Sequence, residues 1–198
     1  MNYYIEKLKN AVNGRTVVFI DAANLEKSVQ DLKVKAGDRL VLPADVDLYC
    51  WRTDYKKIKI FLRKICLLTE VRFYSARFNS YSHNQFLTFL KKELGFKLNT
   101  KEVKEYRDHR PEAPHRKANF DVEIAVDAIL SLKNYDTFIL FSGDCDFAYL
   151  LSILKGRGKT TIVFSRAGHV AKELIIASVY YFDIAKFRGQ ILKIQKRK

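Results

Sequence analysis

Acidic side chains follow two strongly apolar segments of a chain that is otherwise basic. Val17–Ile20 is followed directly by Asp21. Thr137–Phe141 is followed within five residues by Asp144 and Asp146. Carboxylates just past buried parallel strands lie where open α/β sheets bind their ligands, and they repel one another unless a divalent cation or a proton joins them. The pattern predicts an acidic, metal-binding pocket of an enzyme that hydrolyses a polyanion.

A third acidic stretch lies between these two and contains Asp121 and Asp127. Asp121 stands at a predicted helix start, where its negative charge also stabilises the helix. Asp127 comes six residues later, about 120° round the helix from Asp121. We therefore expect Asp121 to complete the site. For Asp127 a supporting role and metal ligation both stay open.

Phosphodiester hydrolysis explains why such a site would consist of aspartates. The reaction needs a nucleophilic water and a leaving oxygen relieved of charge, and one or two divalent ions about 4 Å apart supply both. Hard cations of this kind prefer oxygen ligands. Asp144 and Asp146 flank Cys145, so in an extended turn both carboxylates would point the same way. Cys145 is expected to be a small buried residue.

Each of these residues also has a purely structural interpretation. Asp121 would serve as an ordinary first-turn helix acid, and Asp144 or Asp146 as a helix N-cap. Asn24 would cap the helix after the first strand. The Ser142 hydroxyl would support a metal-bound water, but turn geometry explains this serine equally well.

Alternating apolar strands and amphipathic helices position these residues. They predict an α/β fold, a three-layer α/β/α sandwich with a mainly parallel central sheet. We divide the chain into a helical lead-in over residues 1–14, an α/β domain over residues 15–185 and a basic C-terminal tail over residues 186–198. The second half of the polar segment 101–117, which holds Pro111 and Pro114, is predicted to be a mobile loop.

The composition predicts an anionic partner. The 198 residues carry a net charge of +14, which favours nucleic acid over a membrane surface. Two basic clusters stand out: Arg52–Lys64 has six basic residues and one acid, and Lys186–Lys198 has six and no acid. No segment approaches the roughly 18 apolar residues of a membrane span, and the start lacks the pattern of a secretory leader. With three cysteines and no CxxC pair, these features predict a cytoplasmic protein.

Three motifs in register resemble the NYN domains, the PIN-like nucleases that include the LabA-like bacterial proteins. The motifs are Phe19–Leu25, Lys117–Asp127 and Phe141–Phe147, and they keep the family's order and spacing from about residue 15 to 185. The resemblance implies a PIN-like fold and ribonuclease activity that depends on Mg²⁺ or Mn²⁺. It implies four metal ligands, Asp21, Asp121, Asp144 and Asp146. It also implies that Asn24 orients Asp21.

Two further predictions concern the surroundings of this site. Val179 stands where many NYN relatives have an acid, which predicts a weakened outer site. For RNA binding we select four basic residues, Arg72, Arg77, Arg116 and Lys117.

Together these features predict a metal-dependent endoribonuclease that acts on single-stranded or flexible RNA. A non-catalytic RNA-binding or regulatory protein with a PIN-like shape is the alternative, motivated by Val179. A phosphatase of small esters is a third option, which the charge of +14 disfavours. The oligomeric state stays open, with a homodimer as one option.

Overall fold

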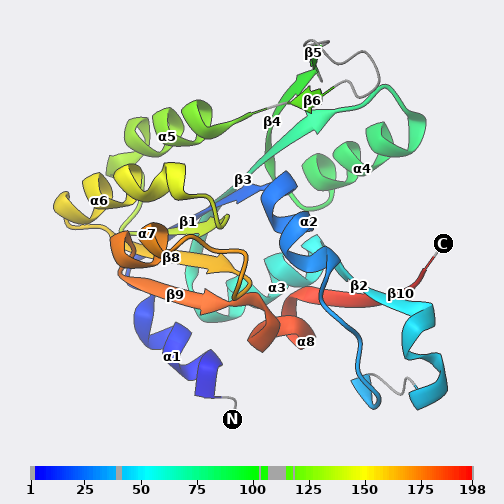
Figure 1. The fold of residues 1–198 in the computed structure, drawn as a ribbon. Helices are drawn as coiled ribbons and strands as arrows, with labels where there is room; N and C mark the ends of the chain where they lie inside the picture. Colours follow the sequence, from blue (N-terminus) through cyan, green and yellow to red (C-terminus); the bar gives the residue numbers. More distant parts are fainter. Residues whose placement is uncertain (1–2, 39–41, 103, 107–114, 118, 198) are drawn as a thin grey trace.

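A six-stranded parallel sheet forms the centre of the molecule (Figure 1). The computed structural model describes residues 3–38, 42–102, 104–106, 115–117 and 119–197. The sheet has the spatial order β4 (Lys97–Glu102), β3 (Leu67–Arg77), β1 (Arg15–Asp21), β7 (Thr137–Phe141), β8 (Thr160–Ser165) and β9 (Tyr180–Asp183). In the middle of the sheet Val18 lies opposite Val71 on one side and Ile139 on the other. The predicted parallel sheet is confirmed.

Helices cover both faces of the sheet, and alternate strand residues supply a core to each face. In β1, Val18 and Ile20 belong to one core, whereas Val17 and Phe19 belong to the other. The first face is covered by α1 (Tyr3–Ala11), α2 (Ala22–Gln30), α3 (Tyr55–Ile65), α4 (Tyr81–Lys92) and α8 (Arg188–Ile191). The second is covered by α5 (Asp121–Leu130), α6 (Ala148–Gly156) and α7 (Lys172–Ala177). This is the predicted three-layer α/β/α sandwich.

A second, two-stranded sheet lies beside the main one. It pairs β2 (Tyr49–Thr53) with β10 (Leu192–Lys196) in antiparallel orientation. The segment that we predicted as a basic tail therefore contains α8 and β10, and Leu192 is fully buried. β10 was not predicted for two reasons. Leu192 and Ile194 are its only apolar residues, so the local strand signal is weak. The strand that pairs with it, β2, is about 140 residues away in the sequence.

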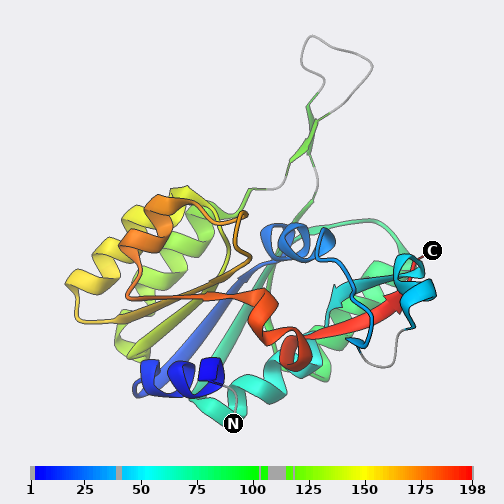
Figure 2. The same ribbon diagram turned by 60° about the horizontal axis from the view of Figure 1, so that its bottom comes forward.

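A small hairpin of β5 (Lys104–Tyr106) and β6 (His115–Lys117) follows β4. Figure 2 shows it extending away from the body of the molecule. Strand β6 thus occupies part of the second half of segment 101–117, which we predicted to be a loop. Pro111 and Pro114 lie outside the described residues.

The described helices are too short or too polar to cross a membrane.

Candidate active site

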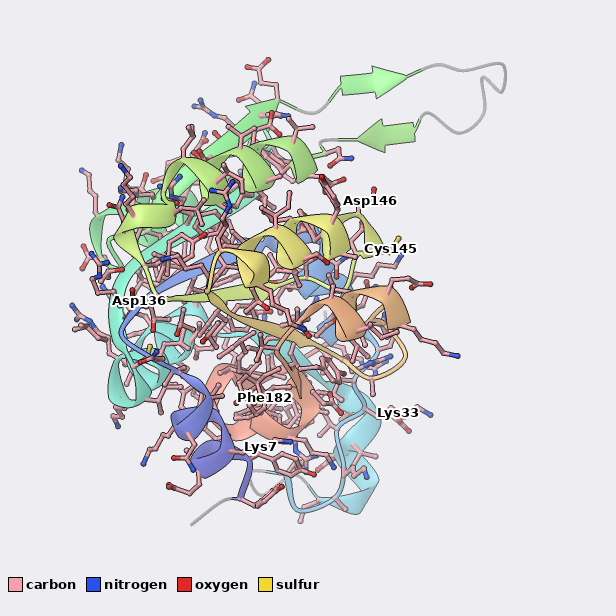
Figure 3. All side chains as sticks on the ribbon, turned by 90° about the vertical axis from the view of Figure 1, so that its left-hand side faces the viewer. Lys7, Lys33, Asp136, Cys145, Asp146 and Phe182 are labelled. Carbon is pink, nitrogen blue, oxygen red and sulfur yellow. The ribbon has the colours of Figure 1, made fainter. Side chains whose placement is uncertain are left out.

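Three of the predicted acids, Asp21, Asp144 and Asp146, lie at the carboxyl edge of the sheet, where β1 and β7 end. From β1 the chain enters α2 on the first face, whereas from β7 it passes through the 3₁₀ turn η4 (Cys145–Phe147) into α6 on the second face. The divergence of two neighbouring connections creates the crevice in which open α/β sheets bind ligands. Figure 3 shows Asp136, which precedes β7, at the opposite end of the molecule from Cys145 and Asp146.

Asp21 ends β1 and is held in place by two hydrogen bonds. Its Oδ1 accepts the backbone N–H of Asn24 at 3.2 Å, which makes Asp21 the N-cap of α2. Its Oδ2 accepts the hydroxyl of the buried Ser142 at 3.3 Å. Burial raises the pKa of Asp21, these two hydrogen bonds oppose the rise, and the nearby charges of Asp121 and Asp144 add to it. The carboxylate is therefore fixed in direction but destabilised in its ionised form.

Asn24 joins the two halves of the site. Its backbone N–H orients Asp21, but its side-chain Oδ1 accepts the backbone N–H of Gly143 at 2.8 Å. The side chain thus connects the start of α2 to the turn after β7. The predicted capping role belongs to Asp21 and not to Asn24.

Gly143 is required by close packing rather than by its backbone angles. A Cβ at this position would lie 2.0 Å from the carbonyl oxygen of His169 and 2.6 Å from Oγ of Ser165. The Gly143 carbonyl also accepts the N–H of Ala171 at 3.0 Å. The loop after β8 therefore supports the turn that carries the acids.

Asp144 and Asp146 lie close together for a different reason from the one predicted. The turn is not extended: Asp144 caps η4, and its Oδ1 accepts the backbone N–H of Asp146 at 3.2 Å. One ligand atom each from Asp144, Cys145 and Asp146 lie within 4.8 Å of one another. Cys145 is exposed, contrary to the prediction. Desolvation and then the two flanking carboxylates raise the pKa of its thiol, so the thiol stays protonated at neutral pH.

Asp121 approaches the same crevice from the start of α5, where its N–H donates to Oδ1 of Asn119 at 2.9 Å. Burial raises the pKa of Asp121, the hydrogen bond with Asn119 opposes the rise, and the charges of Asp144, Asp146 and Glu123 add to it. Asp121 is therefore within electrostatic reach of Asp21, Asp144 and Asp146.

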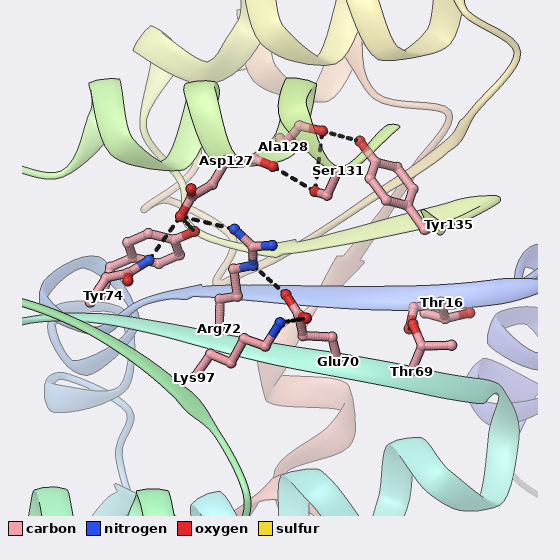
Figure 4. A network of polar contacts seen from close by, with 11 residues as sticks. Thr16, Thr69, Glu70, Arg72, Tyr74, Lys97, Asp127, Ala128, Ser131 and Tyr135 are labelled. Atoms are coloured by element: carbon pink, nitrogen blue, oxygen red, sulfur yellow. Dashed lines mark hydrogen bonds and ion pairs between the residues drawn. The ribbon is translucent and has the colours of Figure 1, made fainter. Parts of the chain in front are cut away.

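Asp127 faces β3 and β4 instead of the other acids (Figure 4). Its Oδ2 accepts the hydroxyl of Tyr74 and the amide of Asn99, both at 2.8 Å, and pairs with Nη1 of Arg72 at 3.1 Å. Arg72 also donates to Glu70 and lies over the Phe19 ring. Of the two roles left open for Asp127, these contacts favour the supporting one, in which Asp127 joins β3 and β4 to α5.

This network changes the set of basic residues that are available to RNA. The Arg72 side chain is only 17% exposed and is occupied by two carboxylates, so we remove it from the predicted RNA surface. Arg77 is exposed at the carboxyl end of β3, on the edge that carries the acids. The side chains of Arg116 and Lys117 lie outside the described part of the chain.

Val179 lies far from the acids. It directly precedes β9, and its N–H donates to the Thr161 carbonyl at the start of β8. This position is on the amino edge of the parallel sheet, opposite the carboxyl edge. The predicted weakening of an outer site by Val179 loses its basis.

Two supporting residues were not predicted from the sequence. Asn119 lies two residues before Asp121, and asparagine side chains commonly accept the backbone N–H two residues further on, which is a local signal that could have indicated this contact. Asn99 lies in β4, an edge strand with no apolar alternation, so nothing local indicates that its amide binds Asp127.

Three comparisons with known proteins concern the family and the fold. A family model described as NYN domain matches residues 15–185. The low amplitude and bright protein LabA from Synechococcus elongatus is 34% identical over 104 residues, which is 52% of this chain and 56% of LabA, so the match spans little more than half of that relative. The crystal structure of VPA0982 from Vibrio parahaemolyticus, a protein of unknown function, has the same fold. Its TM-score is 0.69 at 21% identity, over 91% of this chain and 96% of that one.

Proposed function

Because this chain belongs to the NYN domain family, which includes ribonucleases, we propose that it is a metal-dependent endoribonuclease of single-stranded or flexible RNA. One observation carries the proposal. At the crevice between β1 and β7, ligand atoms of Asp144 and Asp146 lie within 4.8 Å of each other, and the charge of Asp144 raises the pKa of both Asp21 and Asp121, in a chain whose net charge is +14. Such a cluster is costly to the fold unless cations balance it.

The donor set fits Mg²⁺ or Mn²⁺. Asp21, Asp144 and Asp146 would hold the ion, and Asp121 would complete its surroundings. Every donor of this set is a carboxylate oxygen, the type that these hard cations prefer, and the protonated Cys145 thiol is a poor competitor for them. When bound, such an ion lowers the pKa of its water and stabilises charge on the phosphate and the leaving oxygen.

The chain's own contribution is to fix the acids before substrate binds. Ser142 and the N–H of Asn24 each occupy one oxygen of Asp21, which sets the direction of the carboxylate. The Asn24–Gly143 bond holds the turn after β7 at a fixed distance from α2. Arg77, on the same edge, supplies positive charge to the phosphate backbone, which would place the scissile phosphate over the acids.

The direct test uses an end-labelled single-stranded RNA with Mg²⁺ or Mn²⁺. We expect internal cleavage by the wild-type chain, and none by Asp144→Asn plus Asp146→Asn or in EDTA. Glu173→Gln, which removes an exposed charge from α7, is the control and should cleave normally. Thermal unfolding without RNA gives a second readout: Mn²⁺ should raise the Tm of the wild type and of the control but not of the double variant.

Two results would contradict the proposal. Cleavage that persists in the double variant or in EDTA would refute the metal mechanism. Tight RNA binding with no turnover in any divalent metal would favour a non-catalytic RNA-binding protein instead.

A further inference from the structure

The fold joins two basic clusters that are far apart in the sequence. The first begins in β2 and continues into α3, the second covers α8 and β10, and β2 pairs with β10. We propose that this β2–β10 ribbon, residues 49–53 and 192–196, binds single-stranded RNA and extends the acidic site. The inference rests on the proposed function, because it takes RNA as the substrate. β10 lies outside the residues that the family model matches.

Two like charges face each other across the ribbon. Arg52 and Lys193 are directly opposite, and both are exposed. Opposite residues of antiparallel strands share a face, and like charges at such positions destabilise the pair. Neither side chain forms an ion pair with another residue in the described ranges. A phosphate group between them would convert this repulsion into two favourable contacts.

Grooves run along both sides of this face, and both are lined by Arg52 and Gln195. One, of about 780 Å³, lies between the ribbon and the end of α2 and is also lined by Lys33, Lys196 and Arg197. The other, of about 690 Å³, lies between the ribbon and α4 and is also lined by Lys56 and Lys193. The basic side chains of both grooves therefore surround one continuous surface.

The acids that line the grooves do not cancel this charge. They are three, Asp31, Glu26 and Asp54. Six basic residues line the same grooves: Lys33, Arg52, Lys56, Lys193, Lys196 and Arg197. One of the acids, Asp31, also faces the basic pair Arg166 and His169. The unbalanced charge of the surface is therefore positive, as a phosphate backbone requires.

Aromatic rings add a feature that points to a single strand. Phe86 and Phe89 line the groove beside α4, and the Phe89 side chain is 38% exposed. Unpaired bases stack on exposed rings of this kind irrespective of sequence, whereas paired bases in a duplex are not free to do so.

Helix α2 connects the ribbon to the acids. Asp21 caps its first turn, and Gln30, its last residue, lines the larger groove. Nine helical residues span about 14 Å, so a strand that leaves the acids along α2 reaches the ribbon. Figure 1 shows α2 between the main sheet and β2, and Figure 3 places Lys33 toward the same end of the molecule as Cys145 and Asp146.

The test measures binding without cleavage. An end-labelled oligouridylate of about 20 nucleotides, longer than one typical single-strand site, is titrated in EDTA at several KCl concentrations and followed by fluorescence anisotropy. Arg52→Gln plus Lys193→Gln should weaken binding roughly tenfold at moderate salt and lower the salt slope by about 1.4, because each single-strand phosphate contact contributes about 0.7. Lys155→Gln plus Arg157→Gln removes two exposed charges from the amino edge and should change affinity less than about twofold.

The outcomes separate the ribbon from the proposed function. Wild-type chain that binds no RNA at low salt would contradict the proposed function. RNA binding that both double variants weaken equally, or that neither weakens, would overturn the ribbon alone. Arg52→Lys plus Lys193→Arg keeps the charges and should bind like the wild type.

A crosslinking measurement on the unmodified chain covers the case in which the glutamine variant does not fold. The same oligomer with 4-thiouridine should crosslink to peptides of β2 and β10. Crosslinks confined to other elements would overturn the inference.

Discussion

Asp127→Ala tests whether this carboxylate serves the fold rather than the metal site. One oxygen of Asp127 accepts three donors, from Tyr74 and Asn99 at 2.8 Å and from Arg72 at 3.1 Å. The substitution leaves the hydroxyl of the buried Tyr74 without this acceptor. It also removes one of the two carboxylates that contact Arg72. We expect a loss of unfolding free energy and little direct effect on metal binding.

The magnitude follows from the three contacts. Hydrogen bonds to charged groups contribute about 1.5–3 kcal/mol each, so the sum is roughly 4.5–9 kcal/mol. The side chains of Arg72 and Asp127 are 17% and 27% exposed, so water replaces part of this loss, and Arg72 keeps Glu70 as a partner. We expect about 3 kcal/mol after this discount, which for a chain of this length lowers Tm by roughly 6–12 °C.

The assay is thermal unfolding followed by circular dichroism in EDTA and then in Mn²⁺. Glu173→Ala also removes one negative charge, but from an exposed position in α7, and should stay within about 0.5 kcal/mol of the wild type. A Tm of Asp127→Ala within about 2 °C of this control would refute the stabilising role. A normal Tm combined with a lost response to Mn²⁺ would show that Asp127 is a metal ligand.

Three further predictions concern the acids, the supporting turn and the ribbon. Burial and neighbouring acids raise the pKa of Asp21 in the folded chain. A carboxyl group with a raised folded pKa contributes stability at low pH, and this contribution is lost as the pH rises through that pKa. Asp21→Asn should therefore be more stable than the metal-free wild type at pH 7 and equal to it below about pH 3.9. Calorimetry over this range that finds Asp21→Asn less stable than the metal-free wild type at pH 7 would contradict a raised pKa of Asp21. Gly143→Ala forces a Cβ against the His169 carbonyl, and denaturant unfolding should show a loss of about 1–3 kcal/mol; an unchanged midpoint would mean that this contact is loose. Ile194→Asp should separate β10 from the core at a cost of about 2 kcal/mol, with faster amide exchange across Tyr49–Thr53; unchanged exchange there would show that β2 does not depend on β10.

Local pattern carries much of the candidate site. Asp21 and Asp144 were predicted as site residues because each follows a short, continuous apolar strand. Such a strand can be recognised from the few residues that form it. The conformation of the turn was not predicted: Asp144 and Asp146 are adjacent because Asp144 caps a 3₁₀ turn, and nothing in the residue spacing distinguishes this turn from an extended one.

Polar contacts between side chains of different helices and strands could not be predicted from the sequence. Arg72 looked available to RNA as a basic residue beside aromatic ones, yet Glu70 and Asp127 occupy it. The role of Asp127 depends on Asn99, in an edge strand without an apolar signal. Such contacts depend on the distance between residues that no local period relates.

The sequence by itself determined the strands β1 and β7 and the acids at their ends, because a buried strand or a helix start is set by a few neighbouring residues. It also determined the excess of positive charge, which depends on composition alone. Only the tertiary structure decided that β1 and β7 are neighbours, which brings their acids to one crevice, and that β10 pairs with β2, which turns two basic clusters into one surface. The physical reason is that backbone hydrogen bonds between strands can join any two segments, and the choice among them is made by the packing of the whole core.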